Sequence, residues 1–302
     1  MKTYNNLNLD SRHRRSVIAI GNFDGIHLGH QKVINDAKKK AKKNRLPFGL
    51  MTFEPVPVMF FNKKIKNHRI NSLEQKKDQL KKLKLNFLIV IKFNKKFSSL
   101  SPKEFIKKII HKKTNCRFLY VSKNFKFGFK RKGNIETLKK YEKQYNFKNI
   151  IVKPFKAKKK TISSTFIRKK IRKGHIEEVN KLLNRNWSIK GKVIKGQKRG
   201  RKIGFPTCNL KLGSYAIPRL GVYAVKVKTN NINNNGIANI GYRPTFNGQS
   251  LLLETNIFGI NKNLYNKVIT VGFKKFLRAE KKFKSFEHLK KQIKIDIKQA
   301  KK

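Results

Sequence analysis

Hydrophobic positions in the first half of the chain alternate between short apolar runs and stripes of helical spacing. Residues 17–20 (Val-Ile-Ala-Ile) form an apolar run that predicts a buried strand. Val33, Ile34, Ala37 and Ala41 then share one face of a predicted helix. Further strands are predicted at residues 48–53, 85–93, 116–121 and 149–152, and helix starts at Ser72 and Ser101. Strands that alternate with helices predict a parallel sheet covered on both faces.

The pattern changes near Asn184, after which short strands separated by Gly, Asn and Pro dominate. They are predicted at residues 192–194, 222–227, 236–240, 251–258 and 268–273. A last helix begins at Ser285, with Phe286, Leu289, Ile293, Ile297 and Ala300 on one face. We therefore expect an α/β domain with a Rossmann-like parallel sheet in residues 1–185. Residues 186–302 are expected to form an antiparallel β-barrel with a terminal helix.

The charge of the chain does not change the prediction of two domains. The 302 residues include 76 Lys plus Arg against 15 Asp plus Glu, a formal net charge of +61. Such a balance usually indicates nucleic acid or an acidic surface as partner. Here the lysines are spread over nearly every predicted helix and loop, and Asn, Ile and Phe, which also have AT-rich codons, are abundant. A genome-wide codon bias explains this composition, so we expect no specific nucleic-acid partner.

The cysteines and the apolar runs indicate in which cellular compartment the protein is expected. Cys116 and Cys208 are far apart and form neither a disulfide framework nor a metal-ligand motif, which favours a reducing cytoplasm. Residues 1–15 are polar and lack an apolar signal segment. The longest apolar run, residues 87–91, is too short to span a bilayer. We expect a cytoplasmic monomer that does not enter a membrane.

The first candidate for chemistry is the segment after the first strand, residues 21–30 (Gly-Asn-Phe-Asp-Gly-Ile-His-Leu-Gly-His). Free N–H groups at a helix N-terminus attract phosphate, and Gly29 allows the backbone to approach a nucleotide closely. His27 and His30 lie on one face of the first turn and can donate hydrogen bonds to a phosphate in the transition state. An isolated pair would more often be ordinary surface histidines, but the whole string favours a nucleotide site.

A second candidate is the predicted helix start at Ser164 and Thr165. Arg168 falls on the same face, which suits a triphosphate. Taken alone, this stretch is better interpreted as a Ser/Thr cap followed by a basic surface helix.

A third candidate is the glycine-rich basic loop from Gly196 to Gly204, which runs into residues 205–209 (Phe-Pro-Thr-Cys-Asn). Basic loops are common in this chain, so the loop alone is a weak signal. Glu254 is an acid in an apolar strand, where an outward-facing strand residue is about as good an interpretation.

Together these motifs resemble those of one enzyme family. Residues 27–30 match the H-x-G-H signature of nucleotidyltransferases, and residues 21–30 resemble the longer form in bacterial bifunctional riboflavin kinase/FAD synthetases. Residues 163–168 match S-S-T-x-I-R of that family, and residues 204–209 match G-x-P-T-x-N of riboflavin kinases. The resemblance covers about residues 16 to 300. It implies that ATP phosphorylates riboflavin to FMN and then adenylylates FMN to FAD, with release of pyrophosphate.

The resemblance also implies roles for individual residues. Catalytic roles fall to His27, His30 and Arg168 in adenylyl transfer and to Glu254, the general base for the riboflavin 5′-hydroxyl. Thr207 and Asn209 would hold Mg²⁺ against the ATP phosphates, and Asn124 would lie near the flavin or nucleotide. Nucleotide or phosphate contacts are expected from Gly21, Phe23, Asp24, Gly25, Gly29, Ser164, Thr165, Gly196 and Gly204.

Four positions depart from the family pattern. Val56 stands where a His is common and Ser122 where a Gly is usual, and Asn256 and Gly259 differ from the usual strand ending. The departures leave the proposed Thr, Asn and Glu in place and bear on substrate positioning, more for the kinase than for adenylyl transfer.

Two other classes of protein compete with this interpretation. A class I aminoacyl-tRNA ligase shares a two-histidine signature, but the chain has no K-M-S-K-S loop and little room for an anticodon domain. A non-enzymatic RNA-binding protein would need a recognisable module or a concentrated basic face, and neither is visible in the sequence.

Overall fold

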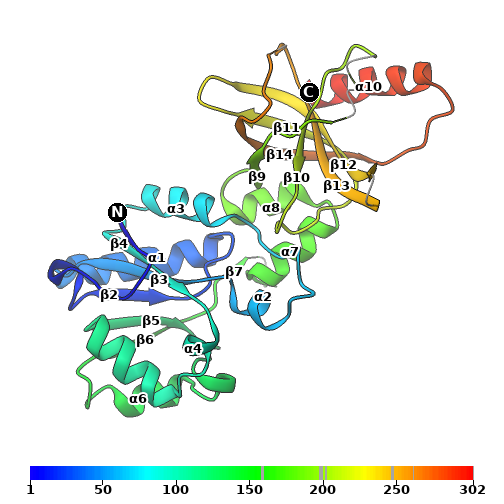
Figure 1. Cartoon of the computed structure of the whole chain (residues 1–302). Helices are drawn as coiled ribbons and strands as arrows, with labels where there is room; N and C mark the ends of the chain where they lie inside the picture. The colour runs from blue at the N-terminus through cyan, green and yellow to red at the C-terminus, as the bar shows by residue number, and fades with distance from the viewer. Residues whose placement is uncertain (158–159, 197–199, 201–202, 246–247, 261, 302) are drawn as a thin grey trace. The chain divides into compact units, whose positions relative to one another are not determined.

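The chain forms two compact units in the computed structural model, which describes residues 1–301 except 158–159, 197–199, 201–202, 246–247 and 261 (Figure 1). The first unit comprises residues 1–66 and 76–163, and the second comprises residues 67–75 and 164–302. The short segment 67–75 thus belongs to the second unit although it comes from the middle of the first.

The first unit is built on a six-stranded parallel sheet in the order β1–β4–β3–β2–β5–β6. Its strands are β1 (Lys2–Tyr4), β2 (Val17–Ile20), β3 (Phe48–Glu54), β4 (Phe87–Lys92), β5 (Phe118–Ser122) and β6 (Lys148–Val152). The four strands predicted from apolar runs at β2 to β5 are present, as is β6. β1 was not predicted, because only its pairing with the open edge of β4 makes this polar segment a strand.

Helices cover both faces of this sheet. They are α1 (Leu28–Lys43), α2 (Pro57–Phe61), α3 (Leu73–Lys82), α4 (Lys95–Ser98), α5 (Pro102–Glu104), a π-helix η2 (Phe105–Lys113) and α6 (Ile135–Tyr141), with 3-10 turns η1 (Ser11–His13) and η3 (Phe129–Arg131). Side chains of η2 and α6 pack with Ile18, Ile20 and Phe87 on one face. On the other face Tyr120 reaches the carbonyl of Asp36 in α1. A β7–β8 hairpin (Lys156–Ala157 and Lys160–Thr161) follows β6.

The two predicted helix starts are confirmed as capping boxes. Ser101 Oγ accepts from the Glu104 backbone N–H at 3.1 Å, and the Ser101 N–H donates to Glu104 Oε2 at 2.9 Å. Ser72 and Gln75 make the same reciprocal pair at 3.2 and 2.9 Å. Each pair satisfies two backbone donors that have no partner inside the helix.

The second unit contains an antiparallel six-stranded barrel in the order β10–β13–β12–β11–β14–β9. Its elements are α7 (Ser164–Arg172), α8 (Ile176–Leu183), β9 (Ser188–Lys192), β10 (Cys208–Lys211), β11 (Gly221–Lys228), β12 (Asn233–Thr245), β13 (Gly248–Ile257), β14 (Val268–Ala279) and α10 (Phe286–Lys301). Ile194, just after β9, bridges back to Asn209 on β10 and nearly closes the barrel. The predicted fold class is confirmed in both halves.

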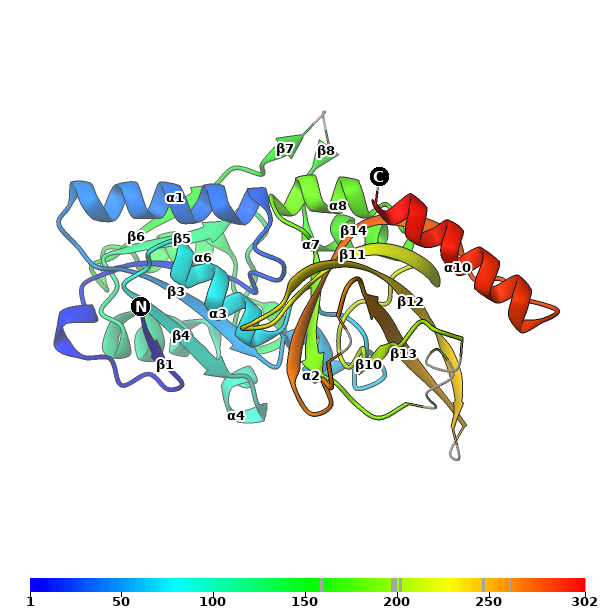
Figure 2. The same ribbon diagram turned by 90° about the horizontal axis from the view of Figure 1, so that it is seen from above.

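The second unit differs from the prediction in three details. The strand expected at residues 192–194 lies earlier, at β9, where Ile189 is buried and pairs with β14. β10 was not predicted. α10 lies along the barrel in Figures 1 and 2 and packs Ile293, Ile297 and Ala300 against β11 and β12, but Phe286 is 65% exposed and does not join that contact.

The segment 67–75 is fixed to the barrel by polar contacts. Trp187, which is fully buried, donates from its indole Nε1 to the carbonyl of Ile70 at 2.8 Å. Gln75 Nε2 donates to Ser188 Oγ at 2.9 Å, and the Tyr215 hydroxyl donates to Gln75 Oε1 at 2.7 Å. These bonds explain why a segment from the middle of the first unit belongs to the second.

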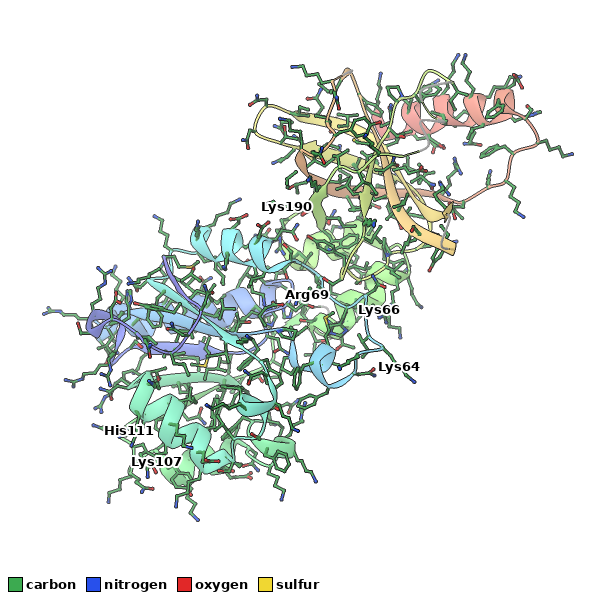
Figure 3. The ribbon with its side chains drawn as sticks, viewed as in Figure 1. Lys64, Lys66, Arg69, Lys107, His111 and Lys190 are labelled. Carbon is green, nitrogen blue, oxygen red and sulfur yellow. The ribbon has the colours of Figure 1, made fainter. Side chains whose placement is uncertain are left out.

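Basic side chains are distributed over both units. Figure 3 shows them projecting from many elements, for example Lys64 and Lys107 in the first unit and Lys190 in the second. In the part of the chain that the structure describes, no helix combines the length and apolar character needed to cross a bilayer.

Candidate functional site

The segment Gly21–His30 lies at the carboxyl edge of the first unit's sheet. The chain moves from β2 to β3 and β4 on one side, and later places β5 and β6 on the other. The sheet order therefore reverses beside β2, and open α/β sheets bind ligands at that point, outside the carboxyl ends of the strands. Asn124 follows β5 at the same edge and is exposed. The predicted nucleotide loop and Asn124 thus occupy neighbouring strand ends.

His27 and His30 stack on each other at the first turn of α1. Their ring centroids are 3.7 Å apart and their planes are inclined by 19°. His27 caps the helix, because its Nδ1 accepts from the His30 backbone N–H at 3.3 Å. That bond assigns the proton of a neutral His27 ring to Nε2, which leaves Nε2–H as a donor. The Phe23 ring lies against His30 with centroids 5.1 Å apart.

His30 is a neutral imidazole in the resting protein. Burial lowers the pKa of His30 well below 6.5, and the nearby His27 and Lys76 lower this pKa further. Its Nδ1 is buried and has no hydrogen-bond partner among the described residues. An anion beside this ring would favour its protonated form.

Gly29 makes room for the His27 ring. A Cβ at this position would lie 3.2 Å from the ring atoms Cε1 and Nδ1 of His27. Asp24 is also buried, at 5% exposure, whereas Gly21 is partly exposed. The substituted position Val56 is buried at the N-terminus of α2, and Ser122 is exposed at the end of β5.

Ser164 and Thr165 begin α7 as predicted, with Arg168 one turn later. Ile167 and Ile171 form the buried stripe of this helix, and Arg168 is partly exposed. Hydroxyl groups at a helix start and an arginine on the next turn are an arrangement that can bind phosphate.

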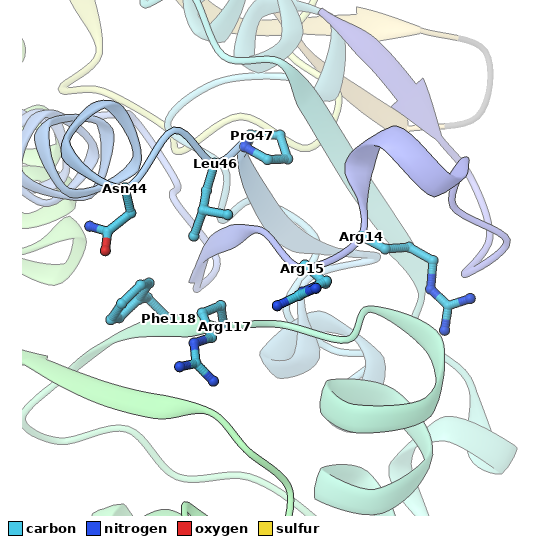
Figure 4. A pocket seen from close by; sticks show the side chains of 7 residues that line it. All are labelled: Arg14, Arg15, Asn44, Leu46, Pro47, Arg117 and Phe118. Atoms are coloured by element: carbon cyan, nitrogen blue, oxygen red, sulfur yellow. The ribbon is translucent and has the colours of Figure 1, made fainter.

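A hollow of about 390 Å³ lies at the opposite, amino-terminal edge of the first unit's sheet (Figure 4). It is lined by Arg14, Arg15, Asn44, Leu46, Pro47, Arg117 and Phe118. Pro47 and Arg117 immediately precede β3 and β5, and Arg15 lies two residues before β2. The hollow therefore contains none of the predicted site residues and lies at the edge where α/β sheets do not place their ligands.

The barrel brings Asn209 and Glu254 together. Asn209 on β10 is directly opposite Glu254 on β13, and Glu254 is opposite Asn239 on β12. Directly paired residues point to the same side of a sheet, so the three side chains form one row. Leu253 and Thr255, the neighbours of Glu254, are fully buried, which places the row on the outer face of the barrel.

Asn209 presents an oxygen atom that can bind a cation. Its side chain is buried, at 6% exposure, and its Oδ1 has no hydrogen-bond partner among the described residues. A Cβ at Gly196 would overlap the Asn209 amide nitrogen, so the start of the glycine-rich loop packs directly on this side chain. Thr207, two residues away, is exposed. A buried oxygen without a partner and an accessible hydroxyl fit Mg²⁺, which prefers oxygen ligands and retains water.

The rest of that loop is described in part. Residues 197–199 and 201–202 lie outside the described residues. Gly204 occupies a turn with φ of +85°, a backbone conformation that favours glycine.

Glu254 is held by Arg243, a residue for which the sequence pattern indicated no role. Arg243 donates to Glu254 Oε2 from Nε at 3.0 Å and from NH2 at 2.7 Å. The NH1 group of Arg243 donates to Glu280 Oε1 at 3.3 Å. Acidic residues are scarce in this chain, so the presence of Glu280 directly after β14 (Val268–Ala279) was a usable signal.

Asn256, one of the departures from the family pattern, supports the same region. Its Nδ2 donates to the carbonyl of Pro206 at 2.8 Å and thereby fixes the residue before Thr207. Gly259 lies in an exposed turn with φ of +70°. A small cavity of about 50 Å³ opens beside Thr207, and its lining also includes Thr255, Asn263, Leu264 and Tyr265.

Two family models match the chain in succession. The FAD synthetase model matches residues 9–166, and the riboflavin kinase model matches residues 183–302. A bifunctional riboflavin kinase/FMN adenylyltransferase of Buchnera aphidicola from Schizaphis graminum is 43% identical over 299 residues, which are 98% of this chain and 96% of the relative. The chain belongs to the bifunctional riboflavin kinase/FMN adenylyltransferase family.

Other members of this family and one solved structure are also similar. The Bacillus subtilis enzyme is 40% identical over 95% of this chain and 92% of its own length. A crystal structure described as a macrolide-efflux protein from Streptococcus pneumoniae has a TM-score of 0.87 and 32% identity, and covers 99% of this chain and 98% of its own. That likeness confirms the two-part fold.

Family membership decides between the functions that the sequence left open. The chain is a riboflavin kinase and an FMN adenylyltransferase, an enzyme that uses ATP to make FMN and FAD. The aminoacyl-tRNA ligase and the non-enzymatic RNA-binding protein are therefore excluded as its identity.

Proposed function

We propose that His27 and His30 carry out adenylyl transfer at the carboxyl edge of the first unit. The observation that carries this proposal is the stacked pair at the first turn of α1, beside the point where the sheet order reverses. In this step a phosphate oxygen of FMN attacks the α-phosphorus of ATP, and pyrophosphate leaves. The Nε2–H of His27 and the free N–H groups of α1 would donate to oxygens whose charge rises in the transition state.

The remaining residues of the predicted site would bind the substrates. The glycines at positions 21, 25 and 29, together with Phe23 and Asp24, shape the loop against the nucleotide. Asn124 would contact the flavin or the nucleotide from the end of β5. Ser164, Thr165 and Arg168 would bind ATP phosphates through the start of α7.

For the kinase, we propose that Glu254 removes the proton of the riboflavin 5′-hydroxyl. Both bonds from Arg243 end on Oε2, so we assign proton acceptance to Oε1. Thr207 and Asn209 would hold Mg²⁺, and Gly196 and Gly204 would allow the loop to approach the phosphates. Bound Mg²⁺ would neutralise charge on the ATP phosphates. The cross-strand pairing of Asn209 with Glu254 supports a common site.

We also propose a functional boundary at residue 185, which is supported by the start of the riboflavin kinase match at residue 183. We propose a cytoplasmic monomer, and the two buried, free cysteines are consistent with a reducing compartment. Riboflavin, FMN and ATP are the proposed ligands. Nucleic acids would bind only through non-specific charge attraction that weakens steeply with salt.

The test of separate sites is a double variant of the full-length protein, His27→Ala with His30→Ala. With riboflavin, ATP and Mg²⁺ supplied, FMN should accumulate and FAD should not form, as measured by chromatography. Glu254→Gln is the reciprocal control, because it should stop FMN formation and leave FAD synthesis from added FMN intact. Loss of both products in a folded double-histidine variant would contradict the assignment.

A further inference from the structure

Lys76 is a lysine in the interior of a protein whose other lysines lie mostly at the surface. Its side chain is 1% exposed and is among the largest fully buried side chains of the chain. An ammonium group is strongly hydrated, so burying it is unfavourable unless several acceptors replace the water. The buried ammonium group of Lys76 therefore requires acceptors within the fold.

The ammonium group of Lys76 contacts the loop that carries the two histidines. Nζ donates to the backbone carbonyl of Asn22 at 2.7 Å and to the hydroxyl of Thr52 at 3.1 Å. The Thr52 hydroxyl in turn donates to the same Asn22 carbonyl at 3.0 Å. Thr52 is fully buried near the end of β3, so Lys76 and Thr52 converge on one oxygen of the loop.

The loop needs such an anchor because its backbone is strained. Phe23 and Ile26 have φ angles of +45° and +40°, a region that residues with a Cβ rarely adopt. Strained backbone of this kind persists where the surrounding structure fixes it. On the far side Gln31 Nε2 donates to the carbonyl of Ile26 at 2.9 Å, while Lys76 fixes the near side at Asn22.

We propose that Lys76 is a positioning residue for adenylyl transfer, which fixes the Asn22 carbonyl and thereby the loop that presents His27 and His30. The inference rests on the function proposed for the two histidines. It also has an electrostatic part, since the positive charge of Lys76 helps to lower the pKa of His30 after burial and His27 have lowered it. Lys76 thus fixes the place of the histidine pair and contributes to the low pKa of His30.

The test uses the full-length protein with Lys76→Met, which keeps the length of the side chain and removes its charge and donors. FAD formation from FMN and ATP should fall in kcat by about 10–100-fold, the range expected when a reacting group is misplaced. FMN formation from riboflavin serves as an internal control and should not change. Lys81→Met, an exposed lysine on the same helix, should leave both reactions unchanged.

The pH profile separates positioning from a general loss of structure. Removal of the positive charge should raise the pKa of His30, so the limb of the kcat profile that reports His30 should move to higher pH. Lys76→Arg retains the charge and should restore that limb, even where kcat remains low. A folded Lys76→Met variant with wild-type kcat and an unshifted limb would overturn the proposal.

Thr52→Val and the double-histidine variant distinguish a failure of this proposal from a failure of the proposed function. Should Lys76→Met fail to fold, Thr52→Val removes the second donor to the Asn22 carbonyl with little change in volume, and wild-type adenylyl transfer in that variant would overturn the proposal. Retained FAD synthesis in the double-histidine variant would instead refute the proposed function. Loss in the histidine variant but not in Lys76→Met would refute the role of Lys76 alone.

Discussion

Arg278 and Asp296 form a doubly hydrogen-bonded ion pair that joins β14 to α10. Nε of Arg278 donates to Oδ1 at 2.8 Å, and NH2 donates to Oδ2 at 2.7 Å. Asp296 is 1% exposed and also accepts from Gln292 Nε2 at 3.0 Å. Arg278 pairs across the sheet with Val222, which packs under α10, so the ion pair fixes the helix to the strands that it covers.

Asp296→Asn should therefore destabilise the second unit. Removal of one partner from a buried ion pair leaves the other charge uncompensated, at a cost of about 3–5 kcal/mol. Urea unfolding followed by Trp187 fluorescence measures this loss, with the exposed Glu287→Gln on the same helix as the control. The double variant Arg278→Met with Asp296→Leu should be less unstable than Asp296→Asn. A loss below about 1 kcal/mol would mean that packing alone holds α10.

Glu254→Gln should slow FMN formation by about 10²–10⁴-fold, the usual contribution of a general base. FAD synthesis from supplied FMN should stay at the wild-type rate. Glu280→Gln is the matched control, because Glu280 contacts the same arginine but is not the proposed base, so its effect should be much smaller. A near-wild-type kinase rate for Glu254→Gln would reduce Glu254 to a structural partner of Arg243.

Gly196→Ala should raise the Mg²⁺ concentration that the kinase reaction requires. The added Cβ would overlap the Asn209 amide and displace the oxygen that we assign to the metal. Titration of Mg²⁺ at fixed ATP should show a concentration for half-maximal FMN formation raised by about tenfold or more. The neighbouring exposed Lys195→Ala should behave as wild type. An unchanged Mg²⁺ dependence would argue against Asn209 as a ligand.

The stability of the first unit should fall as the pH drops below 6.5. The folded-state pKa of His30 is lowered by burial, so the unfolded chain binds more protons in the interval between that pKa and 6.5. Stability is therefore complete above pH 6.5 and is lost as the pH falls toward the folded-state pKa. Hydrogen exchange of amides in β2 and α1 measures the loss.

Other titratable groups with lowered pKa values also contribute to this pH dependence and determine its controls. His30→Gln should reduce the slope without abolishing it, because burial also lowers the pKa of His13. Carboxyls such as Glu104, with a pKa of about 2, contribute only below about pH 4.5. A slope between pH 5 and 6.5 that is the same in His30→Gln and wild type would show that the pKa of His30 is not lowered in the folded protein.

A fragment of residues 186–302 should retain riboflavin kinase activity, as the proposed boundary requires, but with reduced stability. In the second unit α8 packs on β14, and Asn180 donates from Nδ2 to the Phe273 carbonyl at 2.8 Å. The fragment 164–302 keeps these contacts and should be more stable by several kcal/mol, at about 1.5–3 kcal/mol for each buried apolar side chain of α8. Thermal unfolding of both fragments measures the difference. A folded but inactive 186–302 fragment would move the boundary.

Many elements of the fold can be predicted from patterns of residues that lie close together in the sequence. The apolar run at residues 17–20 became β2 without change, and the Ser101 and Glu104 cap formed as expected. Such features depend on residues a few positions apart, whose side chains meet through the geometry of a single strand or helix. The motifs predicted the function in the same way, because the residues of each motif are contiguous in the chain.

Contacts between distant segments were decided by the tertiary structure. β1 is a strand only because the edge of β4 is open, and Arg243 reaches Glu254 only because β12 and β13 are paired. In sequence, Lys76 looks like any other lysine on a basic helix. Its burial follows from the approach of Asn22 and Thr52, which lie on other elements and are distant in the chain. A buried charge is tolerated only where its acceptors are assembled, and that assembly is a property of the folded chain.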